Sequence, residues 1–172
     1  MVANVKFDQK YQALLQEVQR RGLPDVEGIR LCFQVLSLAS SIDRDCARLL
    51  APHGLSEGRF VLMFLLEAAS DGLAPNELAK QAGVTRATVT GLLDGLEREA
   101  LIERRVDSHD RRALRIYLTR KGKQVAVRVF DSHGRWIAGL FSNLTIHERG
   151  HLALLLDKAA GNLCVGGVKT CR

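Results

Sequence analysis

The stretch Pro75-Asn76-Glu77-Leu78-Ala79-Lys80-Gln81-Ala82-Gly83-Val84-Thr85 decides the fold of this chain. It predicts a short helix, a turn at Gly83, and a second helix that Thr85 opens and that runs to about Ala100. Two β-like runs follow, residues 101–106 and 115–118, with the polar loop 107–112 between them. Helix, turn, helix and hairpin in this order predict a winged helix-turn-helix within a mainly α fold that carries a small β hairpin.

The second helix of this stretch has one apolar and one polar face. Its apolar positions recur at helical spacing and are Val89, Leu92, Leu93, Leu96 and Ala100. Its first turns offer short hydroxyls and one long cation, from Thr85, Arg86, Thr88 and Thr90. In a recognition helix this end meets base edges, where arginine pairs with guanine and threonine forms hydrogen bonds or contacts a thymine methyl. The alternative is an amphipathic surface helix whose polar face meets only water.

The positive charge of the chain is concentrated in the hairpin and in the start of the next helix. The chain has 25 Lys and Arg against 19 Asp and Glu, a net charge of +6. Residues 104–123 hold eight basic and two acidic side chains, so this segment carries the whole excess and the remaining residues are balanced. A basic wing beside a recognition helix attracts phosphate, whereas a solvated surface normally mixes its signs. The sequence therefore predicts double-stranded DNA as a partner.

The hairpin resembles the wing of the MarR (multiple antibiotic resistance regulator) family. The resemblance rests on Asp107-Ser108-His109-Asp110-Arg111-Arg112-Ala113, continuing to Leu118-Thr119-Arg120-Lys121-Gly122. Similarity in the helices extends it over about residues 28–163. It implies a transcription regulator, not an enzyme, in which Asp110 braces Arg112 and Arg112 reaches toward the minor groove.

Helix and wing together predict the DNA-contacting side chains. The full set is Thr85, Arg86, Thr88, Thr90, Arg98, Arg104, Arg105, Asp110, Arg111 and Arg112. The helix start is expected at base edges and the wing tip at the minor groove. Arg98, Arg104 and Arg105 are candidates for phosphate contact.

Length and composition suit one globular protein that acts in the cytoplasm. The chain has 172 residues, 47% of them hydrophobic, and a pI of about 9.5. It shows no run of 18 apolar residues and no apolar signal core at its N-terminus, so we expect no membrane association. The spacing of its four cysteines matches no zinc motif, and we assign no metal ion or cofactor.

The remaining apolar patterns predict helices on both sides of the DNA-binding domain. We divide the chain into an N-terminal extension helix (1–27), a dimerisation helix (28–52), the winged helix-turn-helix domain (53–122), and C-terminal dimerisation helices with a tail (123–172). The stripes of residues 28–51 and 145–163 lack enough of their own chain to bury them. The resemblance implies that the terminal helices intertwine with those of a second subunit, which gives a homodimer on a pseudo-palindromic operator.

The resemblance also implies a repressor that a small effector releases from DNA. In the family, a crevice between the dimerisation helices and the winged helix-turn-helix domain binds aromatic acids or phenols. The candidate ligand-binding residues here are His53, Arg59, Phe60 and Met63. Arg59 is the one that can pair with a carboxylate. The alternative, which we favour from the sequence, is a surface arginine.

Cys32 offers an alternative mode of release. Leu31-Cys32-Phe33 resembles the reactive-thiol segment of the family's organic-peroxide-sensing branch. A reactive thiol needs a lowered pKa, which a helix N-terminus or a nearby cation such as Arg30 provides. The simpler interpretation is a small buried packing residue on an apolar stripe. Cys46 lies about 21 Å along the same helix, too far for a bond within one chain.

His147-Glu148-Arg149-Gly150-His151 matches the H-E-x-x-H pattern literally. On a helix, His147 and His151 share a face and bind zinc in metalloproteases, with the glutamate as general base. Against this zinc hydrolase, Thr145 and Glu148 form a capping box, which explains the glutamate without catalysis. We favour the capped helix start.

Overall fold

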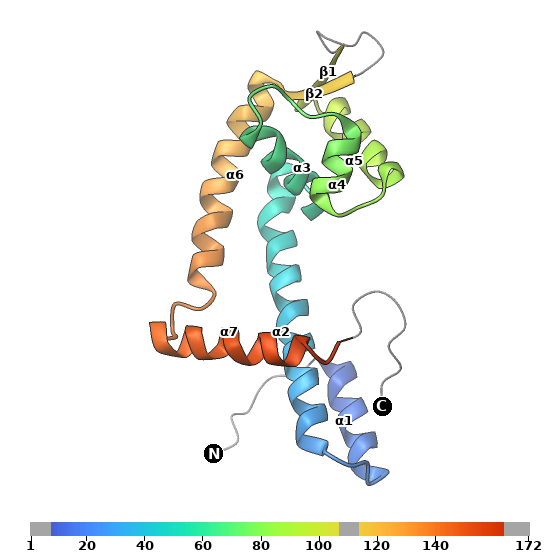
Figure 1. Cartoon of the computed structure of the whole chain (residues 1–172), viewed down its shortest axis with the longest axis vertical. Coiled ribbons are helices and arrows are strands. Elements are labelled where there is room, and N and C mark those ends of the chain that lie inside the picture. Colours follow the sequence, from blue (N-terminus) through green and yellow to red (C-terminus); the bar gives the residue numbers. More distant parts are fainter. Residues whose placement is uncertain (1–7, 107–113, 164–172) are drawn as a thin grey trace. The chain divides into compact units, whose positions relative to one another are not determined.

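The computed structural model describes residues 8–106 and 114–163. The elements, in chain order, are α1 (Gln9–Arg20), α2 (Val26–Leu50), the short 3-10 helix η1 (Ala51–His53), α3 (Glu57–Ala68), α4 (Pro75–Ala82), α5 (Arg86–Arg98), β1 (Ile102–Val106), β2 (Leu114–Leu118), α6 (Arg120–Gly139) and α7 (Ile146–Ala160) (Figure 1). The chain divides into two compact units that meet within α6, between Val129 and Phe130. The predicted mainly α fold with a small β hairpin is confirmed.

The core of the first unit lies between α3, α4, α5 and the hairpin, which pack on one another. Its largest fully buried side chains are Leu50, Leu62, Met63, Leu78, Val89, Leu93, Leu96, Ile116 and Val129. Burial of these side chains is the main contribution to the stability of the winged helix-turn-helix domain. Each large side chain contributes about 1.5–3 kcal/mol. Phe64 of α3 lies outside this core and is 54% exposed.

The hairpin is a two-stranded antiparallel sheet. Its register pairs Ile102 with Leu118 at one end and Val106 with Leu114 at the other. A short bridge from Leu73 to Ile116 ties β2 to the segment before α4. Gly72, at a φ of +65°, allows this approach, because a Cβ there would lie 2.6 Å from the Ile116 carbonyl oxygen.

The end of α5 differs from the prediction. We expected Ala100 to lie on the buried face of a helix that reached it, but α5 ends at Arg98 and Ala100 is exposed at a φ of +56°. The Leu101 N–H donates to the Leu96 carbonyl at 2.9 Å, which closes the helix in the way a glycine usually does. This turn lets β1 start directly beneath α5.

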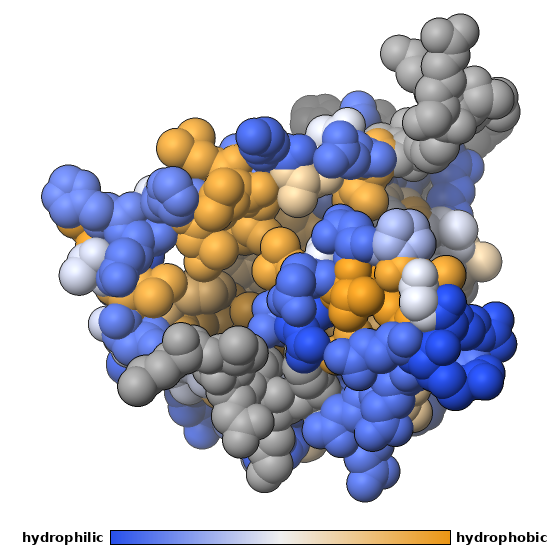
Figure 2. All heavy atoms as spheres, turned by 90° about the horizontal axis from the view of Figure 1, so that it is seen from below, coloured by the Kyte–Doolittle hydropathy of each residue, from blue (hydrophilic) through white to orange (hydrophobic). Residues whose placement is uncertain are grey.

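Two helices carry apolar side chains that their own unit leaves uncovered. On α2 these are Leu31, Val35, Leu36 and Leu38, and on α7 they are Ile146, Leu154, Leu155 and Leu156. No residue of α7 is buried. Figure 2 shows hydrophobic side chains exposed over wide areas of one face of the molecule. Each of the two stripes is therefore left uncovered within its own unit, as the sequence led us to expect.

The N-terminal helix α1 packs against α2. Tyr11 stacks on Phe33 with ring centroids 5.3 Å apart, and the Asp8 N–H donates to the buried Ser37 hydroxyl at 3.2 Å. Within residues 8–106 and 114–163, no single helix is long and apolar enough to cross a membrane. α2 with η1, taken together with α3, reaches that length and composition only as a pair bent by 70°.

Candidate nucleic-acid interface

The turn between α4 and α5 sets the start of the predicted recognition helix. Gly83 closes α4 at a φ of +67°, a conformation that glycine adopts without strain. Thr85 then caps α5, because its hydroxyl accepts from the Thr88 N–H at 3.2 Å. The predicted helix-turn-helix is therefore present, and the positive N-terminal end of α5 suits a phosphate.

α5 has one buried apolar face and one exposed polar face, as its sequence pattern predicts. Val89, Leu93 and Leu96 are buried against the core, and Leu92 is half-buried. The exposed side of the first turns carries the four predicted residues Thr85, Arg86, Thr88 and Thr90. The hydroxyls of Thr85 and Thr88 lie 2.8 Å apart, and the Thr90 hydroxyl donates to the Arg86 carbonyl at 3.0 Å. These bonds hold the threonines in place while lone pairs of their hydroxyls remain free to accept a hydrogen bond from an N–H donor on a base edge.

Arg104 fastens the hairpin to the recognition helix. Its guanidinium donates to Asp94, and its Nε lies 3.1 Å from Glu97 Oε2 without the geometry of a hydrogen bond. Two carboxylates on α5 thus hold one arginine of β1. As a candidate for phosphate contact, Arg104 would have to exchange these partners, so its simplest role is to orient the hairpin.

The other candidate phosphate contacts are more accessible. Arg105 pairs with Glu103, and its guanidinium lies over the Tyr117 ring at 4.8 Å from the centroid. Arg98 is exposed in the last turn of α5. Among the residues that the structure describes, Arg86 and Arg98 form no ion pair, so both cations are available to DNA. The wing-tip candidates Asp110, Arg111 and Arg112 lie outside the described residues.

The start of α6 adds a basic segment to this side of the hairpin. Thr119 caps the helix by accepting from the Gly122 N–H at 2.9 Å, and Arg120, Lys121 and Lys123 follow. Lys121 donates from its amine to the Glu99 carbonyl at the end of α5, at 2.8 Å. Sequence reasoning counted these charges but missed this contact, since it joins residues far apart in the chain.

The candidate effector residues do not gather into one open site. Arg59 donates to Glu99 at 2.8 Å and to the Gly54 carbonyl at 3.1 Å, and its side chain is 24% exposed. Met63 is fully buried in the core, Phe60 is half-buried, and His53 is exposed on η1. A separate hollow of about 290 Å³ beside the hairpin is lined by Leu66, Glu67, Ala69, Ser70, Arg105, Tyr117, Leu118 and Lys123.

The two described cysteines differ in their surroundings. Cys32 is exposed on α2 in the single chain, so burial of this residue, the simpler interpretation of its place on an apolar stripe, would require a second subunit. Cys46 is partly covered, and burial raises the pKa of its thiol, with smaller contributions from Glu57 and Asp43. Cys32 is thus the more accessible of the two.

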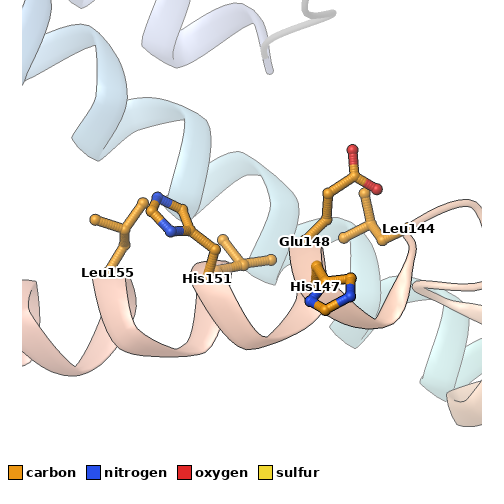
Figure 3. A pocket seen from close by; sticks show the side chains of 6 residues that line it. Leu144, His147, Glu148, His151 and Leu155 are labelled. Atoms are coloured by element: carbon orange, nitrogen blue, oxygen red, sulfur yellow. The ribbon is translucent and has the colours of Figure 1, made fainter.

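The Glu148 carboxylate is held by hydrogen bonds at the start of α7 (Figure 3). Its Oε2 accepts from the N–H and the hydroxyl of Thr145, each at 2.8 Å, and the Thr145 hydroxyl accepts from the Glu148 N–H at 3.3 Å. These bonds lower the pKa of the Glu148 carboxyl, the one from the Thr145 backbone most of all. The predicted capping box is confirmed, and it explains the glutamate of the H-E-x-x-H pattern.

Fold and site together define a winged-helix regulator that binds DNA. The profile of the MarR family matches residues 53–113. The HTH-type transcriptional repressor YetL of Bacillus subtilis is 32% identical over 157 residues, which cover 91% of this chain and 94% of YetL. The transcriptional repressor MprA of Escherichia coli is 29% identical over 135 residues, which cover 78% and 75% of the two chains.

Solved structures give the same result. MepR of Staphylococcus aureus in complex with DNA aligns with a TM-score of 0.63 at 27% identity, covering 72% of this chain and 91% of that chain. The apo form of MarR from Escherichia coli aligns with a TM-score of 0.60 at 25% identity, covering 73% and 93%. The chain belongs to the MarR family of transcription regulators. The predicted family, DNA-binding class and non-enzymatic nature are thereby confirmed.

Proposed function

We propose that this chain is a homodimeric transcriptional repressor that binds a pseudo-palindromic operator and is released by a small aromatic-acid or phenolic ligand. The observation that carries the proposal is the capped, exposed start of α5, where Arg86 and three threonines stand on a helix anchored by its opposite face. Similarity to the repressors YetL and MprA, and to a MepR–DNA complex, supports it.

The uncovered apolar stripes of α2 and α7 support the dimer. Apolar helix faces of this length normally pack against another element. A second copy of the chain would cover them and would give two recognition helices related by a two-fold axis. Two such helices reach successive major grooves about 34 Å apart, which predicts an operator with two half-sites one helical turn apart.

The DNA contacts divide by position. Arg86, Thr88 and Thr90 would contact base edges in the major groove, since they occupy the exposed start of α5. Arg111 and Arg112, with Asp110 as a brace, would enter the minor groove from the wing. Arg98 and Arg105 would contact phosphates.

The Arg59–Glu99 pair offers a route by which a carboxylate ligand releases the operator. The pair joins α3 to the end of α5. A ligand carboxylate that takes the Arg59 guanidinium would compete with Glu99 for it and so loosen the recognition helix. This route applies to the aromatic-acid form of the proposed ligand, because a neutral phenol carries no carboxylate to pair with Arg59.

The experiment that tests the proposal is protection of DNA upstream of the chain's own gene, followed by a ligand screen on the protected fragment. We expect two protected half-sites and a dimer of the 19.0 kDa chain in light scattering. Arg112→Ala should weaken operator binding by roughly 1–3 kcal/mol. The matched control is Arg20→Ala on α1, which should bind as the wild type does. A monomer with full operator affinity would contradict the proposal.

A second candidate mechanism is release by oxidation of Cys32. The observation that favours it is the exposure of Cys32 on α2, since oxidation requires access. Stoichiometric organic peroxide should then release the operator, and Cys32→Ser should abolish the release but not DNA binding. Cys46→Ser is the control and should respond as the wild type does. A wild type that stays bound under peroxide would leave ligand release as the only mechanism.

A further inference from the structure

Gly91 stands in the middle of the recognition helix, where packing within the chain does not require a glycine. It lies inside α5, and among the described residues nothing lies within 4 Å of the position that a Cβ would take. Its φ is not in the left-handed region, so the backbone does not call for glycine either. A glycine inside a helix is less stabilising than an alanine. Gly91 therefore lowers the stability of α5, and no contact within the described part of the chain offsets this.

The second glycine of α5 differs in this respect. A Cβ on Gly95 would lie 2.1 Å from Arg59 Nη2, so packing within the chain accounts for that glycine. Gly95 is buried, whereas Gly91 is exposed. A partner that comes close to the exposed side of α5 would account for Gly91. The apolar stripes that a second subunit would cover lie on α2 and α7, whereas the partner proposed for α5 is DNA.

The exposed side of α5 changes character along the helix. Residues three and four apart share a face, and the row opposite the buried apolar face has four exposed members, Ala87, Gly91, Asp94 and Arg98. Asp94 pairs with Arg104, so its negative charge is balanced where it would face DNA. Ala87 and Gly91, in the first half of the row, present only a methyl group and backbone. The start of α5 therefore offers a small apolar surface on its outermost face.

We propose that Gly91 is the point of closest approach between α5 and the major groove of the operator, and that the surface of Ala87 and Gly91 contacts a thymine methyl group. This assignment rests on the proposed function, in which the start of α5 enters that groove. Neither residue has a side-chain donor or acceptor. The groups that base pairs display in the major groove are donors and acceptors, apart from the thymine methyl. A donor or acceptor covered by this surface would lose its water without gaining a partner, which disfavours every other base.

The absence of a side chain at Gly91 also sets how deeply α5 enters the groove. A Cβ on the face that points at the DNA would hold the helix backbone further from the base edges. Arg86 and Thr90 lie four residues apart beside this surface, so their reach to the bases depends on that depth. Non-specific binding depends on phosphate contacts and not on base edges. Gly91 should therefore matter for the operator and not for DNA of random sequence.

The test compares Gly91→Ala with Gly134→Ala by fluorescence anisotropy, on the protected operator fragment and on scrambled DNA of the same length. Gly134 is the matched control, because it is also exposed inside a helix, α6, with nothing within 4 Å of a Cβ. Both substitutions should raise the urea midpoint, since alanine favours helix. Only Gly91→Ala should weaken operator binding, by about tenfold, as one mismatched base pair does. Its affinity for scrambled DNA should be that of the wild type.

A second readout uses the DNA, because replacement of a thymine by uracil removes only the methyl group. At one thymine of the half-site, this replacement should weaken wild-type binding by about fourfold, the contribution of one buried carbon group of this size. The same replacement should change the affinity of Gly91→Ala little, because the helix of that variant stands too far from the methyl group.

Operator affinity of Gly91→Ala equal to that of the wild type, or an equal loss in Gly134→Ala or on scrambled DNA, would overturn the close approach. Half-sites in which no uracil weakens wild-type binding would overturn the methyl contact. In each of these outcomes the wild type still binds its operator, whereas a wild type that protects no operator would contradict the proposed function itself.

Discussion

The guanidinium of Arg59 lies against the backbone of Gly95 and reaches Glu99, with 2.8 Å between Nη1 and Oε1. A Cβ on Gly95 would lie only 2.1 Å from Arg59 Nη2, so the absence of a side chain there makes the passage possible. The same guanidinium donates to the Gly54 carbonyl. One arginine thus connects α3, the turn after η1 and the end of the recognition helix.

This packing predicts different effects of alanine at two glycines of α5. Gly91→Ala should stabilise the protein by roughly 0.5–1 kcal/mol, because nothing lies within 4 Å of the new Cβ and alanine favours helix. Gly95→Ala should gain less or nothing, because it must displace Arg59 from Glu99. Urea unfolding of both variants measures the difference. Equal stabilisation would mean that the Arg59–Glu99 pair contributes nothing to folding.

The proposed release by a carboxylate ligand makes a second prediction about the Arg59–Glu99 pair. Glu99→Gln removes the charge that competes with a ligand carboxylate for Arg59, so an acidic effector should bind the variant more tightly. Arg59→Met should lose the response to acids but keep operator binding. Fluorescence anisotropy on the operator, with and without the screened ligand, reports both. An acid that releases the Arg59→Met protein at the wild-type concentration would exclude Arg59 from the effector site.

Gly122 predicts a strong packing requirement between α6 and the hairpin. A Cβ there would lie 1.9 Å from the Leu101 backbone oxygen, and backbone cannot move aside as a side chain can. Gly122→Ala should therefore destabilise the protein by about 1–3 kcal/mol. The control is Gly134→Ala in the same helix, where nothing lies within 4 Å and a small gain is expected. Urea unfolding with unchanged stability for Gly122→Ala would contradict the close contact.

The capping box of α7 predicts a dependence of stability on pH. Hydrogen bonds from Thr145 lower the pKa of Glu148 from its usual value of 4.5. A lowered folded-state pKa gives stability that is present above about pH 4.5 and is lost as pH falls through the folded-state value. The gap in urea midpoint between the wild type and Glu148→Gln should therefore narrow from neutral pH to about pH 3. A gap that stays constant over this range would rule out the carboxylate as its cause.

The sequence predicted correctly the structural features that depend on residues adjacent in the chain. Gly83 and Thr85 mark a helix end and a helix start by their own conformational preferences, and both lie where the pattern put them. Ala100 was misjudged because its positive φ depends on a distant residue: the Thr119 hydroxyl donates to the Ala100 carbonyl at 2.8 Å. Helical spacing alone cannot show that bond.

The same limit applies to the charged residues. Arg104 and Arg98 are equivalent as charges in the sequence, but the register of the hairpin brings Arg104 to Asp94 and leaves Arg98 exposed. The Arg59–Glu99 pair spans 40 residues and could not be inferred from spacing. The sequence therefore predicted the fold and the recognition helix. The division of the arginines, into those that stabilise the structure and those that are available to DNA, became visible only in the folded chain.

This division of arginines predicts two kinds of DNA-binding defect. Arg86→Ala should weaken operator binding by roughly 1–3 kcal/mol and relax the preference at one base pair, because Arg86 would form a base contact. Arg98→Ala should weaken binding to operator and random DNA alike and should lower the slope of log affinity against log salt by about one. Arg104→Ala should instead lower folding stability, since it leaves Asp94 and Glu97 without their shared partner.

Fluorescence anisotropy across a salt series, on operator and on scrambled DNA, distinguishes these defects. Arg20→Ala is the control, because Arg20 lies on α1 and pairs with Glu17. A uniform loss for Arg86→Ala on both DNAs would place Arg86 at a phosphate and would move base recognition to the threonines. An unchanged salt slope for Arg98→Ala would remove Arg98 from the interface, and the phosphate contacts of α5 would then rest on its capped N-terminus alone.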